Sequence, residues 1–279
     1  MESLTLVVLA AGMGSRFGGV KQVAAVDDAG HTLVDYGAFD AIRAGFTNIV
    51  CVVTAELEAS FHERVGRHIA AHANLSYAHQ AIPDGRPKPW GTGQAVLVAL
   101  PKVSGSFATI NADDFYGADA YRRMAAFLGE PGEDNAVVGY RLENTMSSFG
   151  TVSRGVCQVV DDRLTGITER TALRPVDGGA VDEAGEFYPG STLVSLNFWG
   201  FRPSAAQAFA DGFEAFAPHA APTQEFYLPD VGGSLMPHVV VLPTTANWLG
   251  VTYADDLPLV KGALAQLVAA GEYPEDLWA

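Results

Sequence analysis

The sequence predicts an α/β fold in which a mixed, mainly parallel sheet is flanked by helices. Short apolar runs rich in β-branched residues alternate with helical patterns through the first half of the chain. A loop with four glycines follows the first of these runs. In the second half the pattern becomes one of alternating apolar and polar residues, which predicts a β-rich insertion. With 279 residues, the chain is long enough to bury the core of one such domain.

Strands and helices of the first half are expected to alternate strictly. In order, they are a strand at 6–9, a helix at 34–46, a strand at 48–54, a helix at 56–73, a strand at 75–79, a helix at 92–100 and a strand at 106–110. The helix at 34–46 ends at Ala44-Gly45, a typical helix stop. Such alternation implies right-handed crossovers and a parallel sheet, whose ligands bind beyond the carboxyl ends of the strands.

The second half is expected to carry the β-rich part and to end in a helix. Its elements are alternating strands at 150–160 and after Asp161-Asp162, a strand at 192–201, a helix at 204–216, a strand at 239–242 and an amphipathic helix at 257–270. Neither an internal repeat nor a low-complexity linker divides the chain. We therefore expect residues 1–279 to form a single domain.

Composition and charge restrict the function. The formal net charge of -15 argues against a nucleic acid or an anionic membrane as the partner. No apolar stretch approaches the ~20 residues of a membrane span, and no signal peptide precedes the first strand, so a cytoplasmic protein is expected. The only cysteines, Cys51 and Cys157, lie in apolar contexts that suit buried thiols, and no Cys/His spacing suits zinc.

The chain is organised around residues 6–22, LVVLAAGMGSRFGGVKQ, whose glycines bring backbone N–H groups close to a ligand. Arg16 and Lys21 add two positive charges to this strand-to-helix turn, so a polyphosphate is the expected ligand. The glycine spacing does not match the dinucleotide fingerprint, and no Gly-Lys-Ser/Thr of a Walker motif is present. The alternative interpretation is an ordinary glycine turn with solvated cations.

Two further segments carry candidate chemistry. In INADDFYG, residues 110–117, adjacent carboxylates end a strand and suit a hydrated Mg²⁺. Adjacent strand residues point to opposite faces, so only one of Asp113 and Asp114 is expected at the metal, while the other could cap a helix beginning near Gly117. The turn-rich segment 80–93 is long enough to be functional, but Gln80 alone suggests only a solvated polar residue.

The segment LAAGMGSRFGGVKQ resembles the signature of the nucleotidyltransferases that activate sugar 1-phosphates. The resemblance implies a glycosyltransferase A-type, Rossmann-like fold with a nucleotide-binding half near 1–135 and a sugar-binding half near 136–279. Arg16 would hold the β- and γ-phosphates, Lys21 the α-phosphate, and Asp113 the metal. The implied nucleotide-binding residues are Leu9, Ala10, Ala11, Gly12, Gly14, Ser15, Arg16, Lys21, Gln80, Gly91, Thr92, Asn111 and Asp113.

The same resemblance implies a sugar site, because segments 139–141, 149–152 and 167–171 follow in the family's order. The implied sugar-binding residues are Tyr140, Gly150, Glu169, Arg170 and Asn197. Arg170 stands where the family has a Lys near the sugar phosphate, and Asn197 is either a sugar contact or a hydrogen-bonded core amide.

A second metal ligand is not assigned by the resemblance. Gly250 occupies the place of the Asp that serves as this ligand in the family. Asp255 or Asp256 is an alternative ligand and equally a helix cap. Mg²⁺ held by Asp113, nucleotide phosphates and water is the other alternative.

The reaction implied is the Mg²⁺-dependent, in-line attack of a sugar 1-phosphate on the α-phosphate of an NTP, giving an NDP-sugar and pyrophosphate. UTP is the first choice of nucleotide, followed by dTTP and CTP, and a homo-oligomer is an open possibility. One alternative is a cytidylyltransferase acting on phosphocholine or another small alcohol phosphate, because the loop between Arg16 and Lys21 is short. A glycosyltransferase and a non-catalytic subunit that binds nucleotide-sugar are the others.

Overall fold

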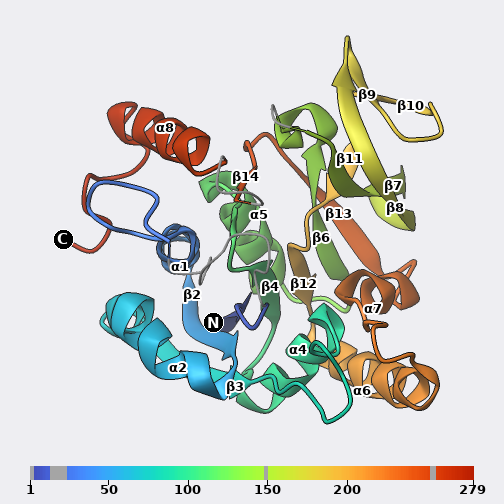
Figure 1. The fold of residues 1–279 in the computed structure, drawn as a ribbon, viewed down its shortest axis with the longest axis horizontal. Coiled ribbons are helices and arrows are strands. Elements are labelled where there is room, and N and C mark those ends of the chain that lie inside the picture. The colour runs from blue at the N-terminus through green and yellow to red at the C-terminus, as the bar shows by residue number, and fades with distance from the viewer. Residues whose placement is uncertain (1–2, 13–23, 148–149, 252–255) are drawn as a thin grey trace.

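The fold is built on one large mixed sheet (Figure 1). The structure is a computed structural model that describes residues 3–12, 24–147, 150–251 and 256–279. The strand order is β10-β9-β8-β7-β11-β6-β12-β4-β1-β2-β3, with β13 pairing with both β6 and β8. The sheet thus continues from the nucleotide-binding half that the sequence predicts into the β-rich half.

Four neighbouring strands form the parallel part of the sheet, since β1 pairs in parallel with β2 and β4, and β2 with β3. They are β1 (Leu4–Leu9), β2 (Phe46–Val53), β3 (Asn74–His79) and β4 (Phe107–Asn111). β1 and β2 are buried along almost their whole length, as expected of apolar strands covered on both faces. The prediction of a parallel sheet in the first half is confirmed.

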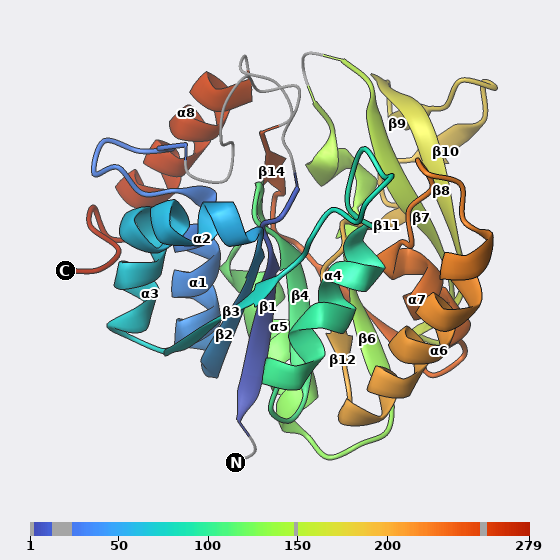
Figure 2. The same cartoon turned by 60° about the horizontal axis from the view of Figure 1, so that its bottom comes forward.

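Helices cover both faces of this sheet (Figure 2). One face packs against α1 (Leu33–Ala44), α5 (Ala118–Gly129) and a helical run composed of α2 (Ala55–Phe61), a π-helical turn (His62–Gly66) and α3 (Arg67–Ala70). The other face packs against α4 (Thr92–Ala99), α6 (Ala206–Phe216) and α7 (Leu228–Ser234). The last helix, α8 (Asp256–Ala269), packs beside α1 in a third apolar cluster.

Local signals explain where α1 begins and ends. Thr32 and Asp35 form a capping box, in which the Thr32 hydroxyl accepts a hydrogen bond from the Asp35 N–H at 3.2 Å and Asp35 Oδ2 accepts one from the Thr32 N–H at 2.8 Å. Gly45 ends the helix in the left-handed conformation, with φ of 107°. The helix stop predicted at this glycine is therefore confirmed.

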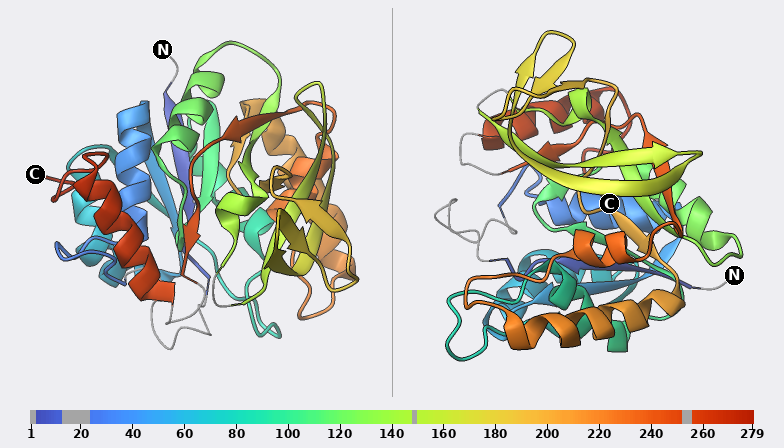
Figure 3. Two further views of the ribbon diagram at one scale, coloured as in Figure 1. Left: turned by 90° about the horizontal axis from the view of Figure 1, so that it is seen from above. Right: turned by 90° about the vertical axis from the view of Figure 1, so that its right-hand side faces the viewer.

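The β-rich half is antiparallel apart from β13, and it lies on the opposite side of the molecule from α1–α3 (Figure 3). Its strands are β6 (Asn135–Arg141), β7 (Val152–Val160), β8 (Arg163–Val176), β9 (Gly179–Val181), β10 (Phe187–Pro189), β11 (Leu193–Ser195), β12 (Trp199–Phe201) and β13 (Val239–Thr244). A separate pair joins β5 (Asp114–Phe115) to β14 (Leu249–Gly250).

Some elements of the second half differ from the sequence-based expectation. The single strand predicted at 192–201 is two short strands, because Asn197 adopts φ of 66° between β11 and β12. Strand β6 and helix α7 were not predicted, although β6 is the central strand that joins β11, β12 and β13.

Cys51 and Cys157 are free and buried, as expected. Within the described ranges, no helix is long and apolar enough to cross a membrane.

Candidate active site

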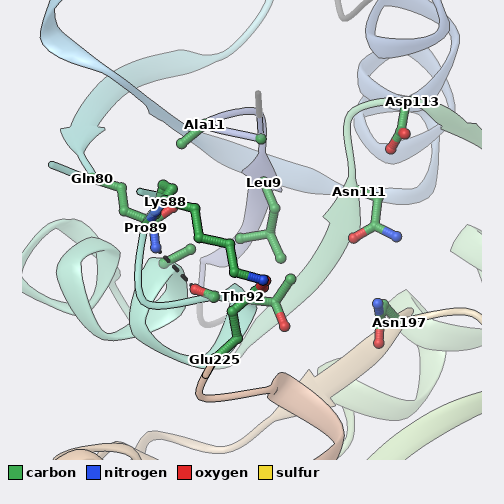
Figure 4. A pocket seen from close by; sticks show the side chains of 13 residues that line it. Leu9, Ala11, Gln80, Lys88, Pro89, Thr92, Asn111, Asp113, Asn197 and Glu225 are labelled. Carbon is green, nitrogen blue, oxygen red and sulfur yellow. Dashed lines mark hydrogen bonds and ion pairs between the residues drawn. The ribbon is translucent and has the colours of Figure 1, made fainter. Parts of the chain in front are cut away.

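A cavity with a volume of about 430 Å³, called the first cavity below, lies at the carboxyl ends of the parallel strands. The register sets Leu9 of β1 beside Asn111 of β4, and Gln80 follows β3 with its N–H bonded to Val53 O at 2.9 Å. Figure 4 shows Asn111, Asp113 and Asn197 on one side of the cavity, facing Gln80, Lys88 and Pro89 on the other. The lining residues are Leu9, Ala11, Gly12, Gln80, Lys88, Pro89, Gly91, Thr92, Ala95, Asn111, Asp113, Asn197 and Glu225.

The start of the glycine loop contributes to this cavity. Leu9, Ala11 and Gly12 line it, whereas Ala10 is buried behind it with its N–H bonded to Val52 O at 2.8 Å. Ala10 therefore supports the loop rather than facing the cavity. The remaining predicted loop residues, Gly14, Ser15, Arg16 and Lys21, lie outside the described residues.

Gln80 is buried rather than solvated, with only 4% of its surface exposed. Its Nε2 donates hydrogen bonds to Gly91 O at 2.9 Å and to Gln94 Oε1 at 2.8 Å. Because a backbone carbonyl can only accept, the first of these bonds fixes which end of the amide carries the nitrogen. Both Nε2 hydrogens are thus used, and among the described residues Oε1 accepts no hydrogen bond. Gln80 presents an acceptor to the cavity.

The segment that precedes α4 is held down by residues from the second half of the chain. The guanidinium of Arg86 stacks on Trp90, 3.6 Å from the ring centroid, and donates to the carbonyls of Ala221, at 3.1 Å, and Gln224. Lys88 forms an ion pair with Glu225, and both residues line the cavity. The sequence-based prediction of the site did not include Lys88 or Glu225. The length of segment 80–93 and its cations were the signal that could have suggested Lys88.

Gly91 allows this close approach. It has φ of 101°, and a Cβ built on it would lie 2.8 Å from both Glu225 Cβ and Phe226 O. Its neighbour Thr92 begins α4, and the Thr92 hydroxyl accepts a hydrogen bond from the Leu228 N–H at 2.9 Å. Thus the Gly-Thr pair joins the cavity wall to the segment that carries Glu225.

Asp113 and Asp114 point into different cavities, in agreement with the predicted alternation. Asp113 lines the first cavity, whereas Asp114 lines a second cavity and is 8% exposed. Asp114 Oδ2 accepts a hydrogen bond from Asn111 Nδ2 at 2.9 Å. Asp114 does not cap helix α5, as the alternative interpretation required. The N-cap residue of this helix is Gly117, and no side chain forms a capping hydrogen bond there.

The second cavity has a volume of about 150 Å³ and adjoins the first, since Asn111 and Asn197 line both. Glu169, which the resemblance implies as a sugar-binding residue, lines it. Desolvation by the surrounding protein raises the pKa of the Glu169 carboxyl, although the residue as a whole is exposed. The positive charge of Arg154 acts in the opposite direction and lowers this pKa. Arg154 was not predicted to belong to the site. The complete lining is Asn111, Asp114, Ser153, Arg154, Gly155, Ile167, Glu169, Ser195, Leu196, Asn197, Pro229 and Trp248.

Asn197 is placed at the junction of the two cavities by a left-handed backbone conformation. Its φ of 66° is one that Asn tolerates better than most residues, and its N–H lies 3.4 Å from Ser195 Oγ. Because Asn197 is partly exposed and lines both cavities, the structure does not support the alternative interpretation of a core amide.

Three predicted sugar-binding residues are not brought to this cavity. Tyr140 is fully buried, and its hydroxyl donates to Tyr116 O at 2.9 Å. Gly150 lines a different cavity, together with Asp256. Arg170 lies next to Glu169 on β8 but turns toward β9 and β10, where its Nη1 and Nη2 lie 3.8 Å from Asp182 Oδ2 and 3.4 Å from Glu186 Oε2. Neighbouring strand residues project to opposite faces, which explains why Glu169 and Arg170 separate.

Gly250 cannot be replaced in this structure by the Asp of the family. It pairs with Asp114, and a Cβ built on it would lie 2.3 Å from the Trp248 ring and 3.1 Å from Asp114 Oδ1. Asp255 lies outside the described residues. Among the described residues, no group of three or more His, Cys, Asp or Glu side chains could hold a metal ion. Oxygen donors of Asp113 and Asn111 still suit a Mg²⁺ ion that keeps water and phosphate ligands.

A parallel sheet with a cavity at the carboxyl ends of its strands is the usual ligand-binding arrangement of open α/β proteins. A model of the family described as "Nucleotidyl transferase" matches residues 5–210. The chain belongs to the nucleotidyl transferase family.

Two solved structures of 14% and 16% sequence identity share this fold. One is described as a glucose-1-phosphate thymidylyltransferase of Bacillus anthracis, with a TM-score of 0.68 over 95% of this chain and 96% of that one. The other is the inositol-1-phosphate CTP transferase of T. maritima, with a TM-score of 0.68 over 96% and 97% of the two chains. No curated protein sequence matches this chain significantly. The expected nucleotidyltransferase fold is confirmed.

Proposed function

We propose that this nucleotidyltransferase transfers a nucleotidyl group from an NTP, with UTP as the first choice, to a sugar 1-phosphate, giving an NDP-sugar and pyrophosphate. The observation that carries the proposal is the pair of adjoining cavities that share Asn111 and Asn197. The larger cavity contains the segments expected to bind nucleotide, and the smaller one offers the carboxylates of Asp114 and Glu169 to the hydroxyls of a sugar.

Gln80 supports a uracil base. Because both Nε2 hydrogens of Gln80 are donated to Gly91 and Gln94, its free function toward the cavity is the acceptor Oε1. Uracil and thymine carry a donor at N3, which would pair with this oxygen, whereas cytosine carries an acceptor there and would be repelled. This places CTP behind UTP and dTTP in our proposal.

Catalysis in this proposal consists of positioning and charge neutralisation. An oxygen of the acceptor phosphate attacks the α-phosphorus in line, the bond to the β-phosphate oxygen breaks, and pyrophosphate leaves without a covalent enzyme intermediate. Arg16 would hold the β- and γ-phosphates and Lys21 the α-phosphate. Asp113 would hold Mg²⁺ with water and phosphate oxygens, and the ion would supply charge neutralisation at the reacting oxygens.

Pyrophosphate release in the presence of Mg²⁺ tests this proposal. UTP, dTTP, CTP, ATP and GTP would each be combined with hexose 1-phosphates, N-acetylhexosamine 1-phosphates and phosphocholine. We expect release that requires both UTP and one sugar 1-phosphate. Release with phosphocholine and CTP alone would instead identify a small-alcohol cytidylyltransferase, and no release with any pair would contradict the proposed reaction.

A cytoplasmic location and a homo-oligomeric state remain predictions of the sequence.

A further inference from the structure

Two arginines face each other across the hairpin that borders the smaller cavity, but their surroundings differ. The register of β7 and β8 pairs Arg154 with Arg170. The Arg170 side chain is 36% exposed and has Asp182 and Glu186 as acidic partners. Arg154 is only 6% exposed, and it forms no ion pair with the described residues, although the charges of Asp114 and Glu169 act on it from a distance and oppose the effect of burial on its pKa.

The guanidinium of Arg154 is fixed in place by neutral groups. Its Nε donates to Thr145 Oγ1 at 3.1 Å and its Nη1 to Ser153 O at 2.8 Å, while Nη2 donates to Thr145 O. The plane of the guanidinium stacks on Trp248, 4.4 Å from the ring centroid. A guanidinium has five N–H groups, so two remain after these three bonds. Arg154 lines the smaller cavity, where these groups would bind a ligand, and it also lines the cavity that contains Gly150.

A buried charge that its surroundings compensate only in part is costly. Burial lowers the pKa of Arg154 to about 10, so the side chain still carries its charge at neutral pH. An anionic ligand in the cavity would compensate that charge and accept the two remaining N–H groups in the fork geometry that suits phosphate. The neighbouring carboxylates of Asp114 and Glu169 would at the same time accept hydrogen bonds from hydroxyls.

We infer that Arg154, and not Arg170, is the cation that binds the phosphate of the acceptor substrate. This inference rests on the proposed function. The smaller cavity begins at Asn111 and Asn197, beside the cavity proposed for the nucleotide, so an acceptor phosphate there lies next to the α-phosphate that it attacks. The full set of side chains favours an acceptor that carries both hydroxyls and a phosphate over a quaternary amine, which has no hydroxyl to donate to Asp114 or Glu169.

The test compares Arg154→Met with Arg170→Met and with Arg163→Met, a matched control at an exposed arginine paired with Asp134. In Arg154→Met we expect the KM of the sugar 1-phosphate to rise by about 10- to 100-fold, the loss typical of charge-assisted hydrogen bonds. The KM of the NTP should change less than about twofold, and both controls should keep the acceptor KM of the unaltered protein. Equal acceptor KM values in Arg154→Met and Arg170→Met would overturn the inference.

A binding measurement separates this inference from the proposed reaction and does not depend on a variant that folds poorly. Trp248 lies under the Arg154 guanidinium, so titration of the unaltered protein with sugar 1-phosphate should change its fluorescence, whereas the phosphate-free sugar should not. Trp248→Phe should lose that change. Phosphate-dependent quenching without pyrophosphate release would uphold the inference and contradict the reaction. Two results would overturn the inference even if turnover is normal. One is an equal fluorescence response to sugar 1-phosphate in Trp248→Phe and in the unaltered protein, and the other is no response in the unaltered protein.

Discussion

At the scale of single residues, the site depends on which direction each side chain takes from its strand. Asp113 and Asp114 are neighbours, yet they enter two cavities. Glu169 and Arg170 are neighbours too, and only Glu169 reaches the site. Because side chains alternate between the two faces of extended backbone, the two members of each pair reach different surroundings.

Removal of the proposed phosphate and metal ligands should reduce turnover. Lys21→Ala and Asp113→Ala are each expected to lower kcat by about 10²-fold or more, the usual loss of one electrostatic stabiliser. Pyrophosphate release by the purified variants measures this, with exposed Asp84→Ala as the control. Near-normal turnover in either variant would remove that residue from the mechanism.

Gly91 provides a test of the wall of the proposed nucleotide cavity. Gly91→Ala adds a Cβ at 2.8 Å from Glu225 Cβ and Phe226 O, at a φ of 101°. The expected cost in folding free energy is about 1–3 kcal/mol, accompanied by a higher KM for the NTP. Gly85→Ala is the matched control, because its φ of 78° imposes similar backbone strain but its Cβ meets nothing within 4 Å. Chemical denaturation compares the two, and an equal loss would show that the contact with Glu225 and Phe226 is unimportant.

At the scale of elements, the sequence predicted the parallel strands and their helices well because each carries its own periodicity and its own stop signals. It failed where tertiary pairing overrides local pattern. The strand predicted at 192–201 is interrupted at Asn197, which leaves the extended conformation to reach the cavities. Arg154 escaped prediction for a similar reason, since nothing in the sequence distinguishes a buried arginine from a solvated one.

Helix α1 carries a buried carboxylate whose ionisation should make stability depend on pH. Asp40 Oδ2 accepts a hydrogen bond from the Tyr273 hydroxyl at 2.6 Å, and burial raises the pKa of Asp40 to about 7. A raised folded-state pKa means that Asp40 favours the folded state most when protonated. The contribution of Asp40 to the free energy of unfolding is therefore fully present below the unfolded-state pKa of ~3.9. This contribution is lost as the pH rises through the folded-state pKa of about 7.

The measurement is the free energy of unfolding of the unaltered protein and of Asp40→Asn between pH 4 and 8. Their difference should change by at most about 1.4 kcal/mol per pH unit in the window between the two pKa values. Tyr273→Phe removes a hydrogen bond that lowers the Asp40 pKa, so it should move the window to higher pH. A difference that is flat across this range would contradict the assignment.

At the scale of the whole molecule, residues from the two halves of the chain line the proposed nucleotide cavity together. Arg86 holds the segment before α4 on residues 221 and 224, and Lys88 pairs with Glu225. Arg86→Met should loosen this contact and raise the KM of the NTP about 5- to 10-fold, since a stacked cation contributes about 1 kcal/mol or more. The acceptor KM should stay unchanged.

Steady-state kinetics measures this effect, with Arg67→Met as the control because Arg67 is exposed and pairs only with Glu63 among the described residues. An unchanged NTP KM in Arg86→Met would mean that the contact does not support nucleotide binding. A rise in the acceptor KM alone would assign the segment to the other substrate.

The two adjoining cavities have a consequence for how such an enzyme changes over evolution. Among the described residues, the two linings have only Asn111 and Asn197 in common. Of these two cavities, the described part of the β7–β8 hairpin lines only the smaller one, and the segment before α4 lines only the larger one. If the proposed assignment of the two cavities holds, selection can alter the hairpin to accept a new acceptor phosphate while the nucleotide preference is inherited intact, and grafting of the hairpin between relatives is the corresponding route for engineering.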